Sequence, residues 1–562
     1  MNLVSPRGIG VCAALLVFAL SSLAFADTLT DKVDAVFADW DQPDSPGCAL
    51  GVVQNGKLIY TRGYGMASLE HRVPISSQSV FYIGSTSKQF VAASVVLAAA
   101  QRQLSLDDDI RKHLPEMPDY GTPITLRHLI HHSSGLRDYL SLMSLAGMPF
   151  ENIYTDEELI ELLARQKQLN FTPGEQYLYS NSGYFLLAQI VKRATGHSLR
   201  AFAEENIFKP LGMTSTHFHD DRTLVVANRA TAYSPQKEGG FRLNWFLNFD
   251  KVGSGGLLTT VEDLYLWDQN FYEIKVGGRD FVQQLLTPGT LNNGQILDYA
   301  FGLAVGEYKG LKTVSHGGAF MGFRAQLLRF PEQKFSVICL CNLSNINPTR
   351  LARQVADIYL ADLFTEEPAA KVKEVKFVAL PEQELKDKVG AYRHPVSGNI
   401  VRLSVKKGKL LASAGGLSFQ LAPLSPTHFR SVDAPVDVTI RFERPSPQDP
   451  WRIQVDTGGR KPDTYEAIQV VSPTPAQLKD YVGAYYSEEL QATYRVVLKE
   501  GQLMLRRRHA AEAPLRPTLR DQFQVGTRGM HVEFVRREPK RVSGFRLHAG
   551  RVRNLRFVRK TP

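Results

Sequence analysis

A duplicated segment near the C-terminal end restricts the possible folds of this sequence more than any other feature. Residues 385–392 (LKDKVGAY) recur as residues 478–485 (LKDYVGAY), at an offset of 93. The same offset aligns residues 401–411 with residues 494–504. Because two separate blocks of sequence match at the same offset, they indicate a repeated module. Both copies consist of short alternating segments with little helical periodicity, so each is expected to fold as a small all-β sandwich or barrel.

The sequence before this repeat has strands at both ends and helices between them. Apolar runs flank Asn55-Gly56, which predicts a hairpin because both residues tolerate positive φ. A second hairpin is expected around a turn at residues 331–334. This order predicts one mixed α/β (α+β) domain whose sheet joins its first and last segments. The helical periodicity predicts helices at residues 89–101, 126–131, 184–195 and 261–271.

Changes in composition give the predicted domain boundaries. A chain of 562 residues is long enough for three or four domains. The predicted organisation is a signal segment at 1–26, a mixed domain at 27–365, a linker at 366–380, a first β repeat at 381–470 and a second β repeat at 474–562.

The net charge of +10 is concentrated in the second repeat. Residues 471–562 contain 19 Lys and Arg against 8 Asp and Glu, whereas the rest of the chain is nearly balanced. The sequence contains neither zinc-finger spacing nor an aromatic RNA-binding motif, so a nucleic-acid partner is not favoured. We expect a solvated basic face or a contact with a cell-envelope polyanion.

The first 26 residues are typical of a secretory signal. They combine Arg7, a 12-residue apolar run at 9–20 and the cleavage pattern Ala24-Phe25-Ala26. An uncleaved membrane anchor is the alternative. No other apolar run approaches the roughly 20 residues of a membrane span. The predicted location is periplasmic or secreted, without a membrane span after removal of the signal.

Three cysteines follow the signal segment, namely Cys48, Cys339 and Cys341. Each lies in an apolar, strand-like run, so we interpret them as three buried thiols. The alternative is a disulfide between Cys48 and one of the other two, because an exported protein meets oxidising conditions.

The strongest chemical motif is S-x-x-K at Ser85-Thr86-Ser87-Lys88. The same spacing occurs at residues 234–237 and 404–407, but only Ser85 opens a predicted helix. Residues i and i+3 share a helix face, so the Lys88 amine can reach the Ser85 hydroxyl. An amine there can act as the base that a serine nucleophile needs, and the helix N-terminus favours a developing oxyanion.

Two further motifs follow in order. Tyr179-Ser180-Asn181 is the only Tyr-x-Asn among the 21 tyrosines. His316-Gly317-Gly318 lies next to a predicted strand, although a second His-x-Gly occurs at residues 548–550. The order of the three motifs within one predicted domain is more specific than any one of them.

With these motifs, residues 30–350 resemble the serine β-lactamase and penicillin-binding protein superfamily. The resemblance is to the branch with class C β-lactamases, D-aminopeptidases and related esterases. It is supported by ITLRHL at 124–129, FTPGE at 171–175 and IFKPLGM at 207–213. It implies an antiparallel sheet flanked by helices, a helical subdomain, and a site in the cleft between them. D-aminopeptidase-like members also carry two lipocalin-like barrels, which the two repeats resemble.

The resemblance implies a role for each motif residue. Ser85 is implied to be the acylated nucleophile, and Lys88 and Tyr179 to share the general-base and proton-relay work. Asn181 is implied to orient the substrate amide. The backbone N–H groups of Ser85 and Ala319 would form the oxyanion hole. No metal and no organic cofactor is implied.

The third motif departs from the family pattern. Penicillin-recognising members usually have Lys-Thr/Ser-Gly, whose cation and hydroxyl bind a substrate carboxylate. His316 and Gly317 stand in those two places, and Gly318 retains the last. Loss of the hydroxyl should weaken carboxylate recognition by about 1–3 kcal/mol. His316 is kept as a catalytic candidate, and Gly318 as a substrate-binding candidate.

These observations predict an exported serine hydrolase that cleaves a small amide or ester bond. The expected partners are small-molecule or peptide substrates, most simply D-amino-acid peptides or amides, or short esters. One alternative is a catalytically weak penicillin-binding or sensor protein. Another is a DD-carboxypeptidase or a β-lactamase.

Overall fold

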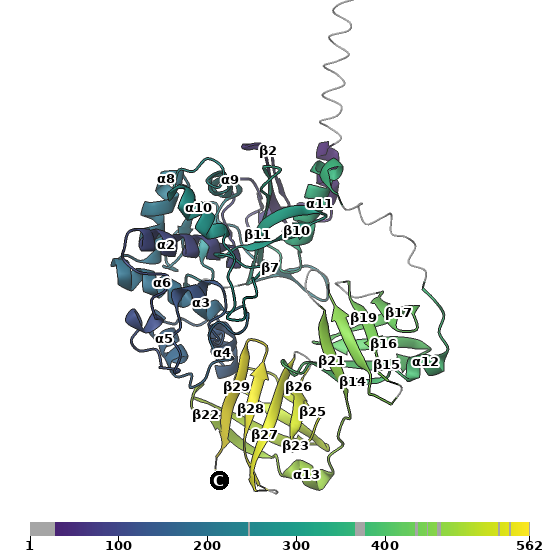
Figure 1. Cartoon of the computed structure of the whole chain (residues 1–562). Helices are drawn as coiled ribbons and strands as arrows, with labels where there is room; N and C mark the ends of the chain where they lie inside the picture. Colours follow the sequence, from purple (N-terminus) through teal and green to yellow (C-terminus); the bar gives the residue numbers. More distant parts are fainter. Residues whose placement is uncertain are drawn as a thin grey trace, which may run out of the picture. The chain divides into compact units, whose positions relative to one another are not determined.

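The structure is a computed structural model, and it describes most of the chain (Figure 1). The predicted signal segment, 1–26, lies outside the described residues, as do residues 366–376 of the predicted linker. The described residues are 29–244, 248–365, 377–432, 437–446, 448–457, 462–526, 529–538 and 541–560.

The chain packs into two compact units. The first consists of the described parts of Met1–Leu114, Ile124–Ser134 and Gly183–Pro368. The second consists of the described parts of Pro115–Pro123, Gly135–Ser182 and Ala369–Pro562. Packing therefore groups residues 135–182 with the two β repeats that follow much later in the chain.

A six-stranded antiparallel sheet forms the core of the first unit. Its strand order is β10-β11-β12-β13-β1-β2. β1 pairs with β13 along its whole length, from Cys48 opposite Cys341 to Gln54 opposite Phe335. The first and last segments of the predicted domain thus share one sheet, as expected. The strands are β1 (Cys48–Gln54), β2 (Lys57–Tyr64), β10 (Ala304–Tyr308), β11 (Leu311–Phe320), β12 (Phe323–Phe330) and β13 (Phe335–Cys341).

Helices cover both faces of this sheet (Figure 1), so every residue of β13 is buried. On one face, Leu351 and Val355 of α11 (Pro348–Tyr359) pack in one core with Val337 and Cys339. On the other face, α9 (Val261–Gln269) lies over β1 and β13. Burial on both faces explains why β13 is a continuous apolar run rather than an alternating one.

The four helices predicted from periodicity are all present. α2 is almost entirely buried, as its apolar composition predicts. The side chain of Thr260 caps α9 by accepting a hydrogen bond from the N–H of Asp263. Between residue 80 and the barrels, the helices are α2 (Lys88–Ala100), α3 (Leu126–Ile130), α4 (Tyr139–Ala146), α5 (Asp156–Ala164), α6 (Asn181–Thr195), α7 (Leu199–Ala203), α8 (Lys209–Leu211), α9 and α10 (Gly278–Leu286), followed by α11.

Short elements connect these helices. They are β3 (Met66–Ser68), β4 (Val73–Pro74), β5 (Phe81–Tyr82), β6 (His217–Phe218), β7 (Tyr233–Pro235), β8 (Phe241–Leu243) and β9 (Leu257–Thr259), with the single turns η1 (Gly84–Ser87), η2 (Ile110–Lys112), η3 (Glu204–Phe208) and η4 (Ala361–Leu363).

The two repeats are closed eight-stranded barrels in which strands adjacent in sequence pair with one another (Figure 1). The fold prediction, a β-lactamase-like domain followed by two β barrels, is confirmed. The first barrel contains α12 (Glu382–Lys386), β14 (Gly390–Arg393), β15 (Ile400–Lys406), β16 (Lys409–Ala414), β17 (Leu417–Ser425), β18 (His428–Ser431), β19 (Thr439–Glu443), β20 (Arg452–Asp456) and β21 (Asp463–Ile468). The second contains α13 (Pro475–Lys479), β22 (Gly483–Ser487), β23 (Ala492–Lys499), β24 (Gln502–Arg506), β25 (Ala513–Pro517), β26 (Gln522–Val525), β27 (Met530–Glu538), β28 (Arg541–Ala549) and β29 (Val552–Arg559).

The repeated LKDxVGAY segment has the same structure in both barrels. The buried phenol of Tyr392 donates a hydrogen bond to the carbonyl of Lys388 over 2.9 Å. In the second copy, Tyr485 donates to the carbonyl of Tyr481 over 2.7 Å. The motif therefore joins the short helix to the first strand of each barrel, which explains its recurrence.

The cysteine interpretation was wrong. Cys48 and Cys341 form a disulfide, and only Cys339 is a free thiol among the described cysteines. Cys339 and Cys341 lie on the same face of β13, with their sulfur atoms 3.6 Å apart. The strand register selects Cys341, because this residue is directly opposite Cys48. Burial raises the pKa of the Cys339 thiol and so disfavours its reactive thiolate.

Among the described residues, the helices include none with the length and apolar character needed to cross a membrane.

The disulfide predicts a specific alkylation pattern. In denatured, non-reduced protein, mass spectrometry should find an alkylating label on Cys339 and should find it on Cys48 and Cys341 only after reduction. The bond closes a loop of 293 residues. Its loss in Cys48→Ser should therefore lower the free energy of unfolding by about 2–5 kcal/mol. Labelling of Cys48 without reductant would contradict this pairing.

Candidate active site

The serine turn η1 leads directly into the buried helix α2. Lys88, the first residue of α2, donates a hydrogen bond from Nζ to the Oγ of Ser85 over 3.0 Å. Ser85 is partly exposed, whereas its neighbours Gly84 and Thr86 are buried. The local structure therefore brings a buried amine to a serine hydroxyl that a substrate can reach.

The surroundings of Lys88 suit a base. The residue has no exposed surface. Its Nζ also donates to the carbonyl of Ser254 over 2.5 Å and lies 5.5 Å from the ring centroid of Tyr184. A neutral amine at this position could accept the proton of Ser85.

The serine turn packs closely against the end of β11. A Cβ on Gly318 would lie 1.8 Å from the carbonyl oxygen of Ile83. A Cβ on Gly84 would lie 2.7 Å from the backbone nitrogen of Ala319, and the φ of Gly84 is +53°. Glycine is therefore required at both positions, and this approach places the Ala319 amide beside the residue preceding Ser85.

The N–H of Ala319 points away from β12. Phe320 and Phe323 flank the two-residue turn between β11 and β12, so they form a hydrogen-bonded pair. The next pair, Ala319 and Arg324, must direct its backbone groups outwards. β10 pairs with β11 only as far as Ser315, so no strand among the described residues covers this edge. An outward N–H at such an edge is suited to hold an oxyanion.

His316 is held as a neutral imidazole. Its Nδ1 lies 2.7 Å from the carbonyl oxygen of Gly317, which can only accept, so Nδ1 carries the proton. Its Nε2 then accepts a hydrogen bond from the hydroxyl of Tyr299 over 3.0 Å. Burial, with the charge of Lys88 adding to it, lowers the pKa of His316 to about 4. At neutral pH, His316 therefore supplies no cation in place of the family's lysine.

Sequence reasoning missed Tyr299. It belongs to an aromatic cluster behind Lys88, in which the ring of His132 lies 4.7 Å from Tyr299 and 5.2 Å from Tyr184. Tyr299 stands in no motif, so only its contact with His316 reveals it.

Tyr179 and Asn181 lie in the second unit, at the start of α6. The backbone N–H of Asn181 donates to Oδ2 of Asp138 over 2.8 Å. Asp138 is buried, and it also caps α4 by accepting from the N–H of Ser141. Asn181 and Tyr184 are three residues apart on one helix and therefore share a face.

The structure thus divides the predicted site residues into two groups. Ser85, Lys88 and the residues of the third motif lie together in the first unit, whereas Tyr179 and Asn181 lie on a segment of the second. These residues of the third motif are His316, Gly318 and the following Ala319, all on β11.

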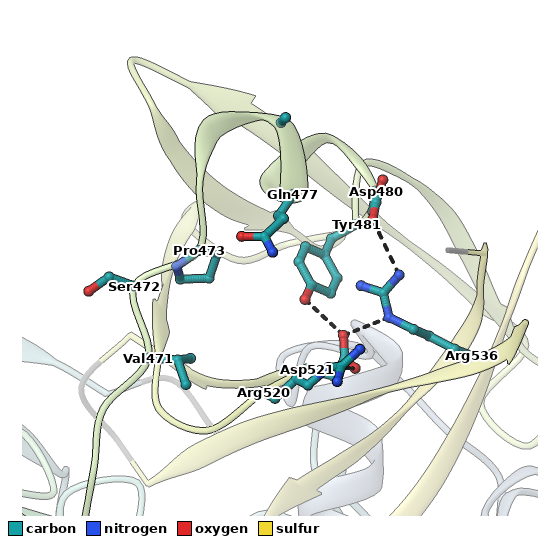
Figure 2. A pocket seen from close by; sticks show the side chains of 10 residues that line it. Val471, Ser472, Pro473, Gln477, Asp480, Tyr481, Arg520, Asp521 and Arg536 are labelled. Atoms are coloured by element: carbon teal, nitrogen blue, oxygen red, sulfur yellow. Dashed lines mark hydrogen bonds and ion pairs between the residues drawn. The ribbon is translucent and has the colours of Figure 1, made fainter. Parts of the chain in front are cut away.

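A separate cavity of about 730 Å³ lies at the α13 end of the second barrel (Figure 2). Its charged groups pair with one another. Arg536 donates to Asp521 over 2.9 Å and to Asp480 over 3.2 Å, and Tyr481 donates to Asp521 over 2.8 Å. The lining lacks a serine–lysine pair like that at Ser85.

Comparison with known proteins identifies the family. A profile of the family described as Beta-lactamase matches residues 32–361. The chain belongs to the beta-lactamase family. The expected membership in a family of serine hydrolases is therefore confirmed.

The sequence is also similar to two curated D-aminopeptidases. It is 30% identical over 299 residues to that of Gluconobacter oxydans (strain 621H) and 30% identical over 302 residues to that of Brucella canis. Each match covers 53% of this chain and 56% of the relative. The chain therefore spans just over half the length of these relatives.

Two solved structures share the fold. The octameric penicillin-binding protein homologue from Pyrococcus abyssi has a TM-score of 0.55 and 23% identity, covering 78% of this chain and 99% of that one. The D-amino acid amidase from Ochrobactrum anthropi SV3, complexed with D-phenylalanine, has a TM-score of 0.51 and 19% identity. That match covers 59% of this chain and 99% of the amidase.

The buried His316 predicts a loss of stability in acid. Its pKa is about 4 in the folded protein and about 6.5 when unfolded, so the unfolded state binds more protons between these values. Stability should be complete above pH 6.5 and should fall as the pH drops towards 4, by about 3 kcal/mol from this residue. Urea unfolding at pH 7.5 and 4.5 should show a smaller decline for His316→Gln than for the parent. The exposed His71→Gln is the control, and equal declines in all three proteins would contradict the prediction.

Proposed function

We propose that this protein is a serine hydrolase that cleaves a small amide or ester bond through an acyl-Ser85 intermediate. The observation that carries the proposal is the 3.0 Å hydrogen bond between the buried Lys88 amine and Ser85. The outward N–H of Ala319 beside this turn supports an oxyanion hole.

In the proposed cycle, Lys88 accepts the Ser85 proton while Oγ attacks the substrate carbonyl. The N–H groups of Ser85 and Ala319 stabilise the oxyanion. The proton then passes to the departing amine or alcohol, and water hydrolyses the acyl-enzyme. Family resemblance assigns Tyr179 to the proton relay and Asn181 to the substrate amide.

The proposed substrates are D-amino-acid peptides or amides, or short esters. The two relatives described as D-aminopeptidases support the first class. The neutral His316 and the missing hydroxyl at Gly317 argue against substrates that depend on carboxylate recognition. Efficient β-lactam hydrolysis and DD-carboxypeptidase activity are therefore disfavoured.

Export to the periplasm or the medium is part of this proposal. The Ala-x-Ala pattern at residues 24–26 supports it, and so does the disulfide between Cys48 and Cys341, because disulfides persist in oxidising compartments. The excess of Lys and Arg in residues 471–562 supports a contact with an envelope polyanion.

Replacement of the nucleophile tests the function. Ser85→Ala should lower kcat on D-amino-acid p-nitroanilides or short p-nitrophenyl esters by more than about 10³-fold without lowering Tm. It should also abolish the fluorophosphonate adduct seen by intact-mass spectrometry. Ser404→Ala is the matched control, because Ser404 is exposed and begins another S-x-x-K tetrapeptide. Equal activity in Ser85→Ala would refute the proposal, and one stoichiometric burst without turnover in the parent would identify a sensor instead.

Restoring the missing hydroxyl tests the specificity argument. In Gly317→Thr, the new Cβ would lie 3.0 Å from Oε1 of Gln326 and 3.6 Å from the carbonyl oxygen of Ala325. The variant should be acylated by benzylpenicillin about tenfold faster than the parent, because a hydroxyl that binds the carboxylate contributes about 1–3 kcal/mol. The control is Gly306→Thr on the neighbouring strand β10, which has open space. Equal penicillin acylation rates in all three proteins would show that this hydroxyl does not determine the specificity.

A further inference from the structure

The second barrel contacts the segment that carries Tyr179 and Asn181, within the second unit. Tyr494 of β23 donates a hydrogen bond to the carbonyl of Leu145 in α4 over 2.7 Å. The contact is centred on Glu489, in the turn between β22 and β23. Glu489 accepts a hydrogen bond from the completely buried Arg137 side chain over 2.7 Å and from the N–H of Lys167 over 2.8 Å. A buried ion pair with additional hydrogen bonds specifies one arrangement of the two surfaces.

A second contact fixes the turn between β28 and β29. The side-chain amide of Asn170 donates to the carbonyl of Arg551 over 2.9 Å and accepts from the N–H of Arg553 over 2.8 Å. Arg137 also donates from Nε to the carbonyl of Arg553 over 3.0 Å. These are bonds to the backbone, so the position of Arg551 does not depend on its own side chain.

The Arg551 side chain then reaches both predicted site residues. Its guanidinium carbon lies 4.8 Å from the ring centroid of Tyr179. Its NH1 lies 3.7 Å from Oδ2 of Asp138, the same oxygen that accepts the N–H of Asn181. One arginine of the second barrel thus stacks on the phenol ring and balances the carboxylate that holds the start of α6.

We propose that Arg551 is a positioning residue of the active site, which holds Tyr179 and, through Asp138, Asn181 in their working geometry. The second barrel is then a functional part of the hydrolase. This inference rests on the proposed function. A tyrosine side chain has two free torsions, and a guanidinium over its ring restricts both. A displacement of about 1 Å in a positioning group can lower a rate by about a hundredfold.

The charge of the second barrel supports this role. Arg551 and Arg553 are among the 19 Lys and Arg of residues 471–562, yet both face the segment 135–182. Arg553 donates to the side chain of Gln176 over 3.0 Å. Part of the basic character therefore serves contacts within the chain.

Arg551→Ala tests the inference, with Arg551→Lys as the conservative variant. The control is Arg556→Ala, an exposed arginine of β29. Arg551→Ala should lower kcat and the rate of Ser85 phosphonylation by about tenfold to a hundredfold, with a smaller change in KM and with a Tm close to that of the parent. Arg551→Lys should recover part of this loss, and Arg556→Ala should match the parent. If Arg551→Ala does not fold, Arg551→Lys tests the inference instead. Lysine keeps the positive charge but lacks the planar guanidinium, so this variant should still show a reduced kcat.

A spectroscopic readout tests positioning independently of turnover. In protein labelled with 3-fluorotyrosine, the resonance of Tyr179, assigned with Tyr179→Phe, should shift or broaden in Arg551→Ala and not in Arg556→Ala. An unchanged resonance, or an unchanged kcat in an active protein, would overturn the inference. A parent protein that neither turns over substrate nor labels at Ser85 would instead refute the proposed function.

Discussion

The candidate active site depends on one close backbone approach, that of Gly318 on β11 to the carbonyl of Ile83 before the serine turn. A side chain at Gly318 would separate the turn from the strand. The approach brings the outward N–H of Ala319 beside Gly84, the residue before Ser85, while α2 brings the Lys88 amine to the Ser85 hydroxyl. The sheet makes this possible because β11 extends past the end of β10. A free strand edge, elsewhere an aggregation hazard, here supplies a backbone donor.

What the sequence could predict follows from the range of each interaction. The contact between Ser85 and Lys88 is local, since the two residues are three positions apart at a helix start, and the motif was sufficient to predict it. The partner of Cys48 was not predictable, because Cys339 and Cys341 share a face and only the strand register distinguishes them. Tyr299 is separated by 17 residues from His316 and has no motif. The contact between Arg137 and Glu489 spans 352 residues, which no periodicity can reveal.

The two barrels show how one motif tolerates different chemistry at its variable position. Both keep the tyrosine that bonds back to the residue four positions earlier. In the first barrel that residue is Lys388, whose Nζ lies between 5.4 and 5.9 Å from three aromatic rings, those of Phe429, Phe442 and Trp451. In the second it is Tyr481, which instead bonds to Asp521 and lies under Arg536. Each barrel end thus combines a cation with aromatic rings. In the first barrel the motif residue, Lys388, is the cation, whereas in the second the motif residue, Tyr481, is the aromatic ring and Arg536 is the cation.

The protonation states of Lys88 and His316 are linked by their proximity. A charged Lys88 disfavours a second cation at His316, and the hydrogen bonds to Gly317 and Tyr299 fix the imidazole in a neutral tautomer. Of this pair, Lys88 is the residue that is hydrogen-bonded to Ser85. The third motif therefore combines a neutral, buried imidazole with an outward backbone N–H. His316 thus supplies no counter-ion for a carboxylate, which favours the proposed amide and ester substrates.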